Sequence, residues 1–100
     1  MRIAEIIGTV TLSRSHPSFQ GATLKLAVPL SLANLSNQEL PQADPLVVWD
    51  PLGAGMHDRI AISEGGEAAQ PFRPDMKPVD AYNAALLDKI ELDEKQKLLF

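Results

Sequence analysis

The chain has 100 residues, of which 45% are hydrophobic and 22% charged, with a formal net charge of -4. This length corresponds to about one small domain, and the apolar content is too high for a disordered segment. The acidic balance disfavours nucleic acid and other polyphosphate partners, and the lack of cysteine excludes disulfides, thiolate metal sites and cysteine nucleophiles.

Two alternating segments near the N-terminus predict a pair of antiparallel strands. In residues 4–12 the even positions are apolar or glycine, with Glu5, Thr9 and Thr11 between them, which is the period of a strand. In residues 24–30 the even positions are again apolar, and Lys25 and Ala27 fall on the other side. Residues 13–22 are rich in Ser, Pro and Gly and predict a long connecting loop. Pro29 lacks an amide donor, which indicates a strand end or a sheet edge.

The middle of the chain contains two further short strands separated by irregular segments. Residues 31–45 keep no clean period and predict a loop with a helical turn. The run at 46–49 is β-branched and aromatic, which favours a buried strand, and Trp49 at its end is expected in the core or at an interface. Residues 59–63 alternate again. Three prolines in residues 70–78 predict an irregular or polyproline II-like segment.

Residues 79–92 are ambiguous from local sequence. Val79, Tyr82, Leu86 and Ile90 fit one face of a helix, and the alanines, leucines and lysines around them favour helix. The alternation near residues 86–92 also fits a strand. Local sequence alone favours the helix and leaves the strand open.

Short strands joined by long polar connections predict a mostly β fold. Closing a small sheet into a barrel removes its unpaired edges. We therefore expect a small closed five-stranded OB-like β-barrel with short helical segments. No stretch approaches the roughly 20 apolar residues that span a bilayer, and no secretory signal is evident. We expect a cytoplasmic protein with no membrane partner.

The residues that could carry chemistry do not form a recognisable site. Gly53 and Gly55 resemble half of a dinucleotide-binding motif, but Asp58 stands where the third glycine would fall and would repel a phosphate. His16 and His57 lie far apart in loops and lack the spacing of a zinc site. No serine lies in a G-x-S-x-G turn. We predict no catalytic, cofactor-binding or metal-binding residues.

An OB-like barrel that binds oligosaccharide or single-stranded nucleic acid is the alternative function. Such barrels carry aromatic and basic side chains together on a strand face, because bases stack and phosphates need cations. The five aromatic residues of this chain do not alternate with basic residues on any expected strand. A small enzyme with a dispersed site is a more remote alternative.

Three stretches of the sequence resemble the EutN/CcmL family of bacterial microcompartment vertex proteins. They are "MRIAEIIGTVTLSRSHPSFQGATLKLAVPL", "LVVWDPLGAGMHDRIAISEGGEAA" and "KPVDAYNAALLDKI", and they follow the family's order through most of the chain. The resemblance implies a barrel domain over residues 1–92 and a C-terminal extension over 93–100. It also implies that the segment beginning at Pro78 is a strand, and we adopt the strand because barrel pairing can override helix propensity.

The resemblance further implies a structural protein without enzymatic activity or cofactors. Five copies would form a cyclic homopentamer that caps the vertices of a polyhedral shell in the cytoplasm, with hexameric shell proteins tiling the facets. The glycine-containing loop would lie near a narrow central pore, where its amide N–H and C=O groups would set which solutes pass. The residues assigned to this pore or interface loop are Asp50, Gly53, Ala54, Gly55, Met56 and His57.

The remaining interface assignments are apolar. Residues 98–100 are too apolar for a solvated tail and are expected to dock on a neighbouring subunit or another shell protein. The expected subunit interface comprises Leu52, Phe72, Leu98, Leu99 and Phe100. Two positions depart from the family. His57 stands where its members usually have glycine, so the turn must tolerate a side chain, and residues 65–70 lack the arginine that members tend to have there, which puts an intersubunit arginine contact in doubt.

Overall fold

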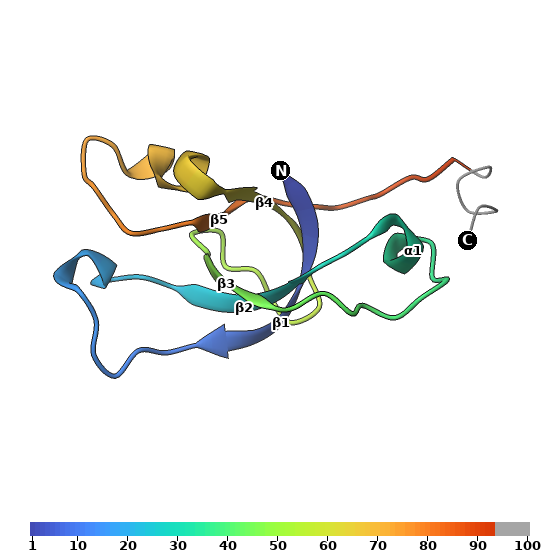
Figure 1. Ribbon diagram of the computed structural model, residues 1–100, viewed down its shortest axis with the longest axis horizontal. Coiled ribbons are helices and arrows are strands. Elements are labelled where there is room, and N and C mark those ends of the chain that lie inside the picture. The colour runs from blue at the N-terminus through green and yellow to red at the C-terminus, as the bar shows by residue number, and fades with distance from the viewer. Residues whose placement is uncertain (94–100) are drawn as a thin grey trace.

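The fold is a closed β-barrel with short helices at both ends. The structure is a computed structural model that describes residues 1–93. The elements in chain order are β1 (Arg2–Val10), η1 (Pro17–Phe19), β2 (Leu24–Pro29), α1 (Leu32–Leu35), β3 (Leu46–Trp49), β4 (Arg59–Glu64), η2 (Gly65–Phe72) and β5 (Ala81–Leu86). The strands close in the order β1-β2-β3-β5-β4, as Figure 1 shows. The predicted five-stranded barrel is confirmed.

Strand pairing follows the sequence pattern closely. β1 pairs antiparallel with both β2 and β4, β2 with β3, and β4 with β5, while β3 and β5 meet in parallel at Trp49 and Tyr82. The register of β1 against β2 shifts between Ile6 and Gly8. This shift is a β-bulge, which places an extra residue in β1 and bends the strand locally. Pro29 ends β2, as expected from its missing donor.

The barrel interior is filled by small and β-branched side chains. These buried residues are Ala4, Ile6, Ala27, Val48, Ala54, Ile60, Ile62 and Ala81. The predicted alternation in residues 4–12 puts Ala4 and Ile6 inside. In β2 the fully buried Ala27 points into the barrel. Lys25, two residues earlier, therefore points inward too. The small interior side chains match the narrow space that a five-stranded barrel encloses.

Two local expectations are wrong. The helix favoured locally for residues 79–92 does not form; Ala81–Leu86 is strand β5, because it pairs with β4 over five positions and its burial alternates. The segment at 70–78 is not irregular throughout, since Gln70–Phe72 complete the 3-10 helix η2 with Pro71 inside it. The helical turn expected in 31–45 is α1, which Ser31 and Asn34 cap reciprocally.

The two ends of the barrel carry different additions. Helices η1 and η2 extend from one end, and α1 together with residues 87–93 extends from the opposite end (Figure 1). Within residues 1–93, no helix combines the length and the apolar character needed to cross a bilayer. The loop from β3 to β4 runs along the barrel between these ends and carries the glycines singled out in the sequence.

Candidate functional site

The loop of residues 50–58 is folded around one buried carboxylate. Asp50 follows β3 directly and is 1% exposed. Its Oδ1 accepts the amide N–H of Leu52 at 3.1 Å, and its Oδ2 accepts that of Ala54 at 2.8 Å. An aspartate that binds amides two and four residues later closes a compact turn. The loop is therefore held in one shape by its own first residue.

Side chains from two other strands hold the same carboxylate. Asn83 of β5 donates its Nδ2 hydrogen to Oδ1 of Asp50 at 2.9 Å and is fully buried. The Nζ atom of Lys25 on β2 lies 3.5 Å from Oδ2 of Asp50 and donates to the carbonyl of Ala54 at 2.5 Å. We call Lys25, Asp50 and Asn83 the polar cluster.

The charge of Asp50 is stabilised within this cluster. Burial acts to raise the pKa of the Asp50 carboxyl. The hydrogen bond from Asn83, the two amide hydrogen bonds from the loop and the charge of Lys25 outweigh burial, so the pKa lies below its usual value. Asp50 is accordingly ionised at neutral pH.

The two glycines of the loop serve different purposes. Gly53 has a φ of +73°, a backbone conformation that costs free energy for any residue with a β-carbon. Gly55 has no such φ, and a β-carbon placed on it would meet only the Asp58 carboxylate, at 3.4 Å. Its amide N–H donates to the Oδ2 atom of Asp58 at 2.7 Å. Gly53 is needed by its own chain, whereas nothing among residues 1–93 demands glycine at Gly55.

His57 occupies a glycine-like backbone conformation. Its φ is +68°, a backbone conformation that glycine adopts more readily than a residue with a β-carbon. Its amide N–H donates to the Ile6 carbonyl at 2.8 Å, and the Ile6 amide donates to the Asp58 carbonyl at 2.9 Å. Its Nδ1 atom lies 3.2 Å from Oε2 of Glu5. The end of the loop is thereby tied to β1 at its bulge.

The exposed side chains of the loop include two large apolar ones beside the polar His57 and Asp58. Leu52 and Met56 are 46% and 57% exposed. The amides of Leu52, Ala54 and Gly55 are bonded to carboxylates of the same chain. These three amides are therefore already paired within their own chain, and the expectation that N–H and C=O groups of this loop select solutes stays a prediction.

A cluster of aromatic rings covers the end of the barrel that carries η1 and η2. Trp49 lies 4.7 Å from Phe72 and 5.9 Å from Phe19 between ring centroids, and Phe72 lies 5.5 Å from Tyr82. The Nζ atom of Lys77 lies 5.6 Å from the rings of both Trp49 and Phe72. We call these four rings the aromatic cluster. Trp49 is buried, as expected, in a second apolar cluster outside the barrel interior, and Phe72 is half-buried within its own chain.

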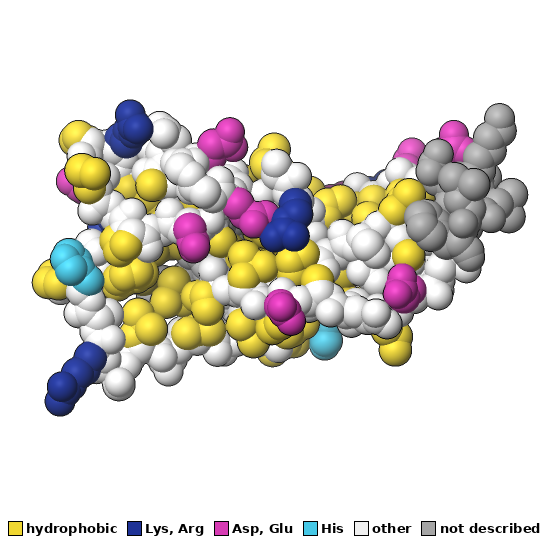
Figure 2. Space-filling model, in the orientation of Figure 1, with side chains coloured by type: hydrophobic (Ala, Val, Ile, Leu, Met, Phe, Trp, Pro, Cys, Tyr) yellow, Lys and Arg dark blue, Asp and Glu magenta, His cyan; other side chains and the backbone are white. Residues whose placement is uncertain are grey.

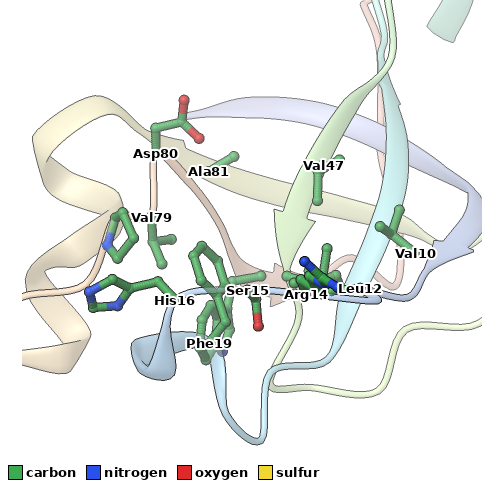
Figure 3. Close-up of a pocket in the computed structure, with 13 residues that line it drawn as sticks. Val10, Leu12, Arg14, Ser15, His16, Phe19, Val47, Val79, Asp80 and Ala81 are labelled. Carbon is green, nitrogen blue, oxygen red and sulfur yellow. The ribbon is translucent and has the colours of Figure 1, made fainter.

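A cavity of about 350 Å³ opens beside the aromatic cluster. Its lining includes Val10 at the end of β1, Leu12 after that strand, Phe19 of η1, Val47 of β3 and Val79 before β5 (Figure 3). In Figure 2 hydrophobic side chains gather around the hollow at this end of the molecule. Such a groove suits apolar side chains of a partner better than a charged ligand.

The described residues offer little to the competing functions. Among residues 1–93 no three His, Asp or Glu side chains group as a metal site. Trp49 and Tyr82 stand on neighbouring strands, but their rings pack against Phe72, and Trp49 is only 9% exposed to a stacking base or sugar. The binding-module alternative is not favoured.

Sequence reasoning found the loop but missed two of the residues that hold it. Asp50, Gly53, Ala54, Gly55, Met56 and His57 lie together in one segment, and Leu52 is exposed among them. Lys25 and Asn83 were not selected. The available signal was the alternation of β2, which puts Lys25 on the side of Ala27. The expected tail contacts of Leu98, Leu99 and Phe100 lie outside the described residues.

The chain is similar to proteins of known assembly. The model of the family described as "Ethanolamine utilisation protein EutN/carboxysome" matches residues 1–88. The carboxysome shell vertex protein CcmL of Gloeobacter violaceus is 33% identical over 95 residues, covering 95% of this chain and 90% of that protein. A solved structure of Gloeobacter violaceus CcmL gives a TM-score of 0.80 at 29% identity, covering 93% of this chain and 91% of that one.

A second solved structure agrees with the first. The GrpN pentameric microcompartment shell protein from Rhodospirillum rubrum gives a TM-score of 0.77 at 26% identity. The likeness covers 93% of this chain and 100% of that one. The residues that the family model matches include all five strands and the loop of residues 50–58.

Proposed function

The chain belongs to the EutN/CcmL family, and on that premise we propose that it is a structural shell protein whose homopentamer caps the vertices of a bacterial microcompartment. The observation that carries the proposal is the likeness, over nearly the whole chain, to a solved protein described as a pentameric microcompartment shell protein. The 33% identity to a carboxysome shell vertex protein supports the same assembly. The chain itself would carry no catalytic activity.

A ring of identical subunits explains how such a protein could close a shell. Each copy presents two different patches, and the rotation between neighbours decides how many copies close the ring. A five-fold ring among six-fold units introduces the curvature that a flat hexagonal layer lacks. We therefore propose hexameric shell proteins as partners and a cytoplasmic shell as the location. The proposal includes neither nucleic acid nor a membrane as a partner.

We place loop 50–58 where copies of the chain crowd together around the ring axis. Gly55 supports this placement, because its own chain leaves room for a β-carbon at ordinary contact distance from Asp58. We expect Gly55→Ala to leave the monomer fold intact and to weaken the ring. Gly53→Ala would be a poor substitute, since its φ of +73° strains any side chain within the monomer. A Gly55→Ala ring as stable as the wild type would contradict the placement.

The apolar groups of the loop supply the contact between subunits. Leu52 and Met56 are exposed in the single chain and would become buried between copies. Phe72 would contribute only the part of its ring that Trp49 and Tyr82 leave uncovered. The C-terminal residues 98–100 of the extension 93–100 would dock on a neighbouring subunit or another shell protein.

Co-expression with hexameric shell proteins tests the vertex role. We expect closed polyhedral particles when the chain is present, and open sheets or tubes when it is absent or when Gly55→Val replaces it. Electron microscopy of purified particles distinguishes these forms. Closed particles of unchanged size without the chain would contradict the proposal.

A further inference from the structure

The loop of residues 50–58 is shaped from inside the barrel. We propose that Lys25 and Asn83 are positioning residues for ring assembly: they hold the Asp50 carboxylate, which holds the loop in the form that meets neighbouring subunits. The part that concerns assembly rests on the proposed function. The part that concerns loop shape rests on contacts within one chain.

The first step is that the polar cluster joins three strands beneath the loop. Lys25 lies on β2, Asp50 follows β3 and Asn83 lies on β5. The side chain of Lys25 is 13% exposed, and that of Asp50 is fully buried. The cluster is therefore nearly closed to water, and its contacts depend on the strands being in place.

The second step is that Ala54 is fixed on both sides of its backbone. Its amide N–H donates to Oδ2 of Asp50, and its carbonyl accepts from Nζ of Lys25. Ala54 is 1% exposed and packs in the barrel core. Moving the centre of the loop therefore breaks two hydrogen bonds and exposes a core residue at once. Gly53 and Gly55, on either side of Ala54, follow its position.

The third step concerns why a charged pair serves here. Burying Lys25 and Asp50 removes both from water, and an apolar pair of similar volume would avoid that desolvation. An apolar pair could not bind the amides of Leu52 and Ala54 or the carbonyl of Ala54, so it would leave the loop free to take other shapes. The main effect of the charged pair is therefore to hold the loop in one conformation, and its effect on the free energy of unfolding is secondary.

The fourth step links loop shape to completion of the fold. The Lys25 contact with Ala54 spans 29 residues of sequence, and the Asn83 contact with Asp50 spans 33. Both contacts exist only after β2, β3 and β5 have come together. A chain with an open barrel would lack the assembled loop, so only closed barrels would enter the ring.

The test compares Lys25→Met with Lys89→Met in the full chain. Both substitutions remove one lysine charge, but Lys89 pairs with Glu91 at the surface, where both side chains are about three-quarters exposed. Two quantities are measured: amide hydrogen exchange of residues 50–58 and of the strands, and subunit count by native mass spectrometry. We expect Lys25→Met to speed amide exchange at Leu52 and Ala54 by about tenfold or more, because that is the change expected when one hydrogen bond from a charged group is lost.

The outcomes separate the two parts of the proposal. Faster loop exchange, protected strands and a depleted ring in Lys25→Met, with Lys89→Met unchanged, support it. Unchanged loop exchange overturns the positioning role, and a loosened loop in a fully populated ring overturns the link to assembly. If Lys25→Met does not fold, the same measurements are made on Lys25→Gln. We then expect loop amides to exchange at a rate between those of the wild type and of a chain without the contact, and exchange at the wild-type rate would contradict the positioning role. A wild-type chain that forms no ring would refute the proposed function while loop exchange still tests positioning.

Discussion

Trp49 and Asp50 are neighbours in the chain, yet they hold two different parts of the surface by different forces. Trp49 packs outward among aromatic rings and fixes the segments that carry η1 and η2. Asp50 points inward and fixes loop 50–58 through hydrogen bonds and charge. Apolar packing tolerates small adjustments, whereas a carboxylate that binds specific amides allows one arrangement. The part expected to meet other subunits is the one held by directional contacts.

The same alternation repeats on two further strands. Leu24 pairs with Trp49, which pairs with Tyr82, and these three belong to the aromatic side. The residue that follows each of these three belongs to the polar cluster, namely Lys25, Asp50 and Asn83. The period of two along the strands therefore places the aromatic cluster outside the barrel and the polar cluster inside it, at the same level along the barrel. We call the first the aromatic anchor and the second the polar anchor. The comparison predicts that the two anchors fail differently when altered.

The largest effect is expected from removing the centre of the aromatic cluster. Trp49→Ala should lower the free energy of unfolding by about 3–5 kcal/mol, since it deletes a ring that contacts Phe19 and Phe72 and leaves a cavity. Urea denaturation followed by circular dichroism measures the change. Met76→Ala is the control, because Met76 is 93% exposed and should change stability by less than about 0.5 kcal/mol. Equal effects of the two variants would contradict the aromatic anchor.

A smaller effect is expected within the polar cluster. Asn83→Leu should cost about 1–3 kcal/mol, because the buried Asp50 carboxylate loses a hydrogen-bond donor while the branching of the side chain is kept. Chemical denaturation compares it with Gln42→Leu, an exposed polar residue replaced in the same way. A stabilised Asn83→Leu chain would show that the polar cluster is not held as described.

The polar anchor should also respond to acid, unlike the aromatic one. The folded pKa of Asp50 is lowered, so its stabilising contribution is complete above the unfolded carboxyl value of about 4 and is lost as the pH falls through the lower folded value. Arg2 lowers the pKa of the exposed Glu64 and acts in the same direction. Urea midpoints measured from pH 6 to pH 2 should fall less steeply in Asp50→Asn than in the wild type. Parallel slopes would contradict the role of Asp50.

The smallest effect is a gain at the end of the loop. His57→Gly should stabilise the folded chain by about 1 kcal/mol, because glycine adopts a φ of +68° without the penalty that a β-carbon brings. Asn37→Gly, at a φ of +62°, is the matched control and should gain less, since asparagine tolerates this conformation better. Thermal unfolding measures both. A destabilised His57→Gly chain would mean that the Glu5 contact outweighs the backbone strain.

Sequence reasoning recovered the elements whose patterns are local. Residues 46–49 were predicted as a strand with the bounds that β3 has, and Pro29 ended β2 as its missing donor required. Residues 81–86 could not be assigned locally, because alanine and leucine favour helix and only pairing with β4 makes them a strand. The family resemblance supplied that strand where local propensity pointed to a helix.

The site was recovered only in part for a related reason. Gly53, Gly55 and Asp50 are adjacent in sequence, so a glycine pattern revealed them together. Lys25 and Asn83 join them only through contacts that span 25 residues or more, and a lysine in a strand is usually a surface residue. Nothing local marks Lys25 as buried, because a place opposite the leucines of β2 is also what a solvent-facing lysine would have.

The subunit count of the wild-type chain tests the central claim most directly. Native mass spectrometry at micromolar concentration should show one dominant particle with five times the 10.9 kDa mass of the chain. Five copies are expected because the chain shares its fold, over nearly its whole length, with a pentameric microcompartment shell protein. A stable monomer, or a ring with a different number of copies, would contradict the vertex function.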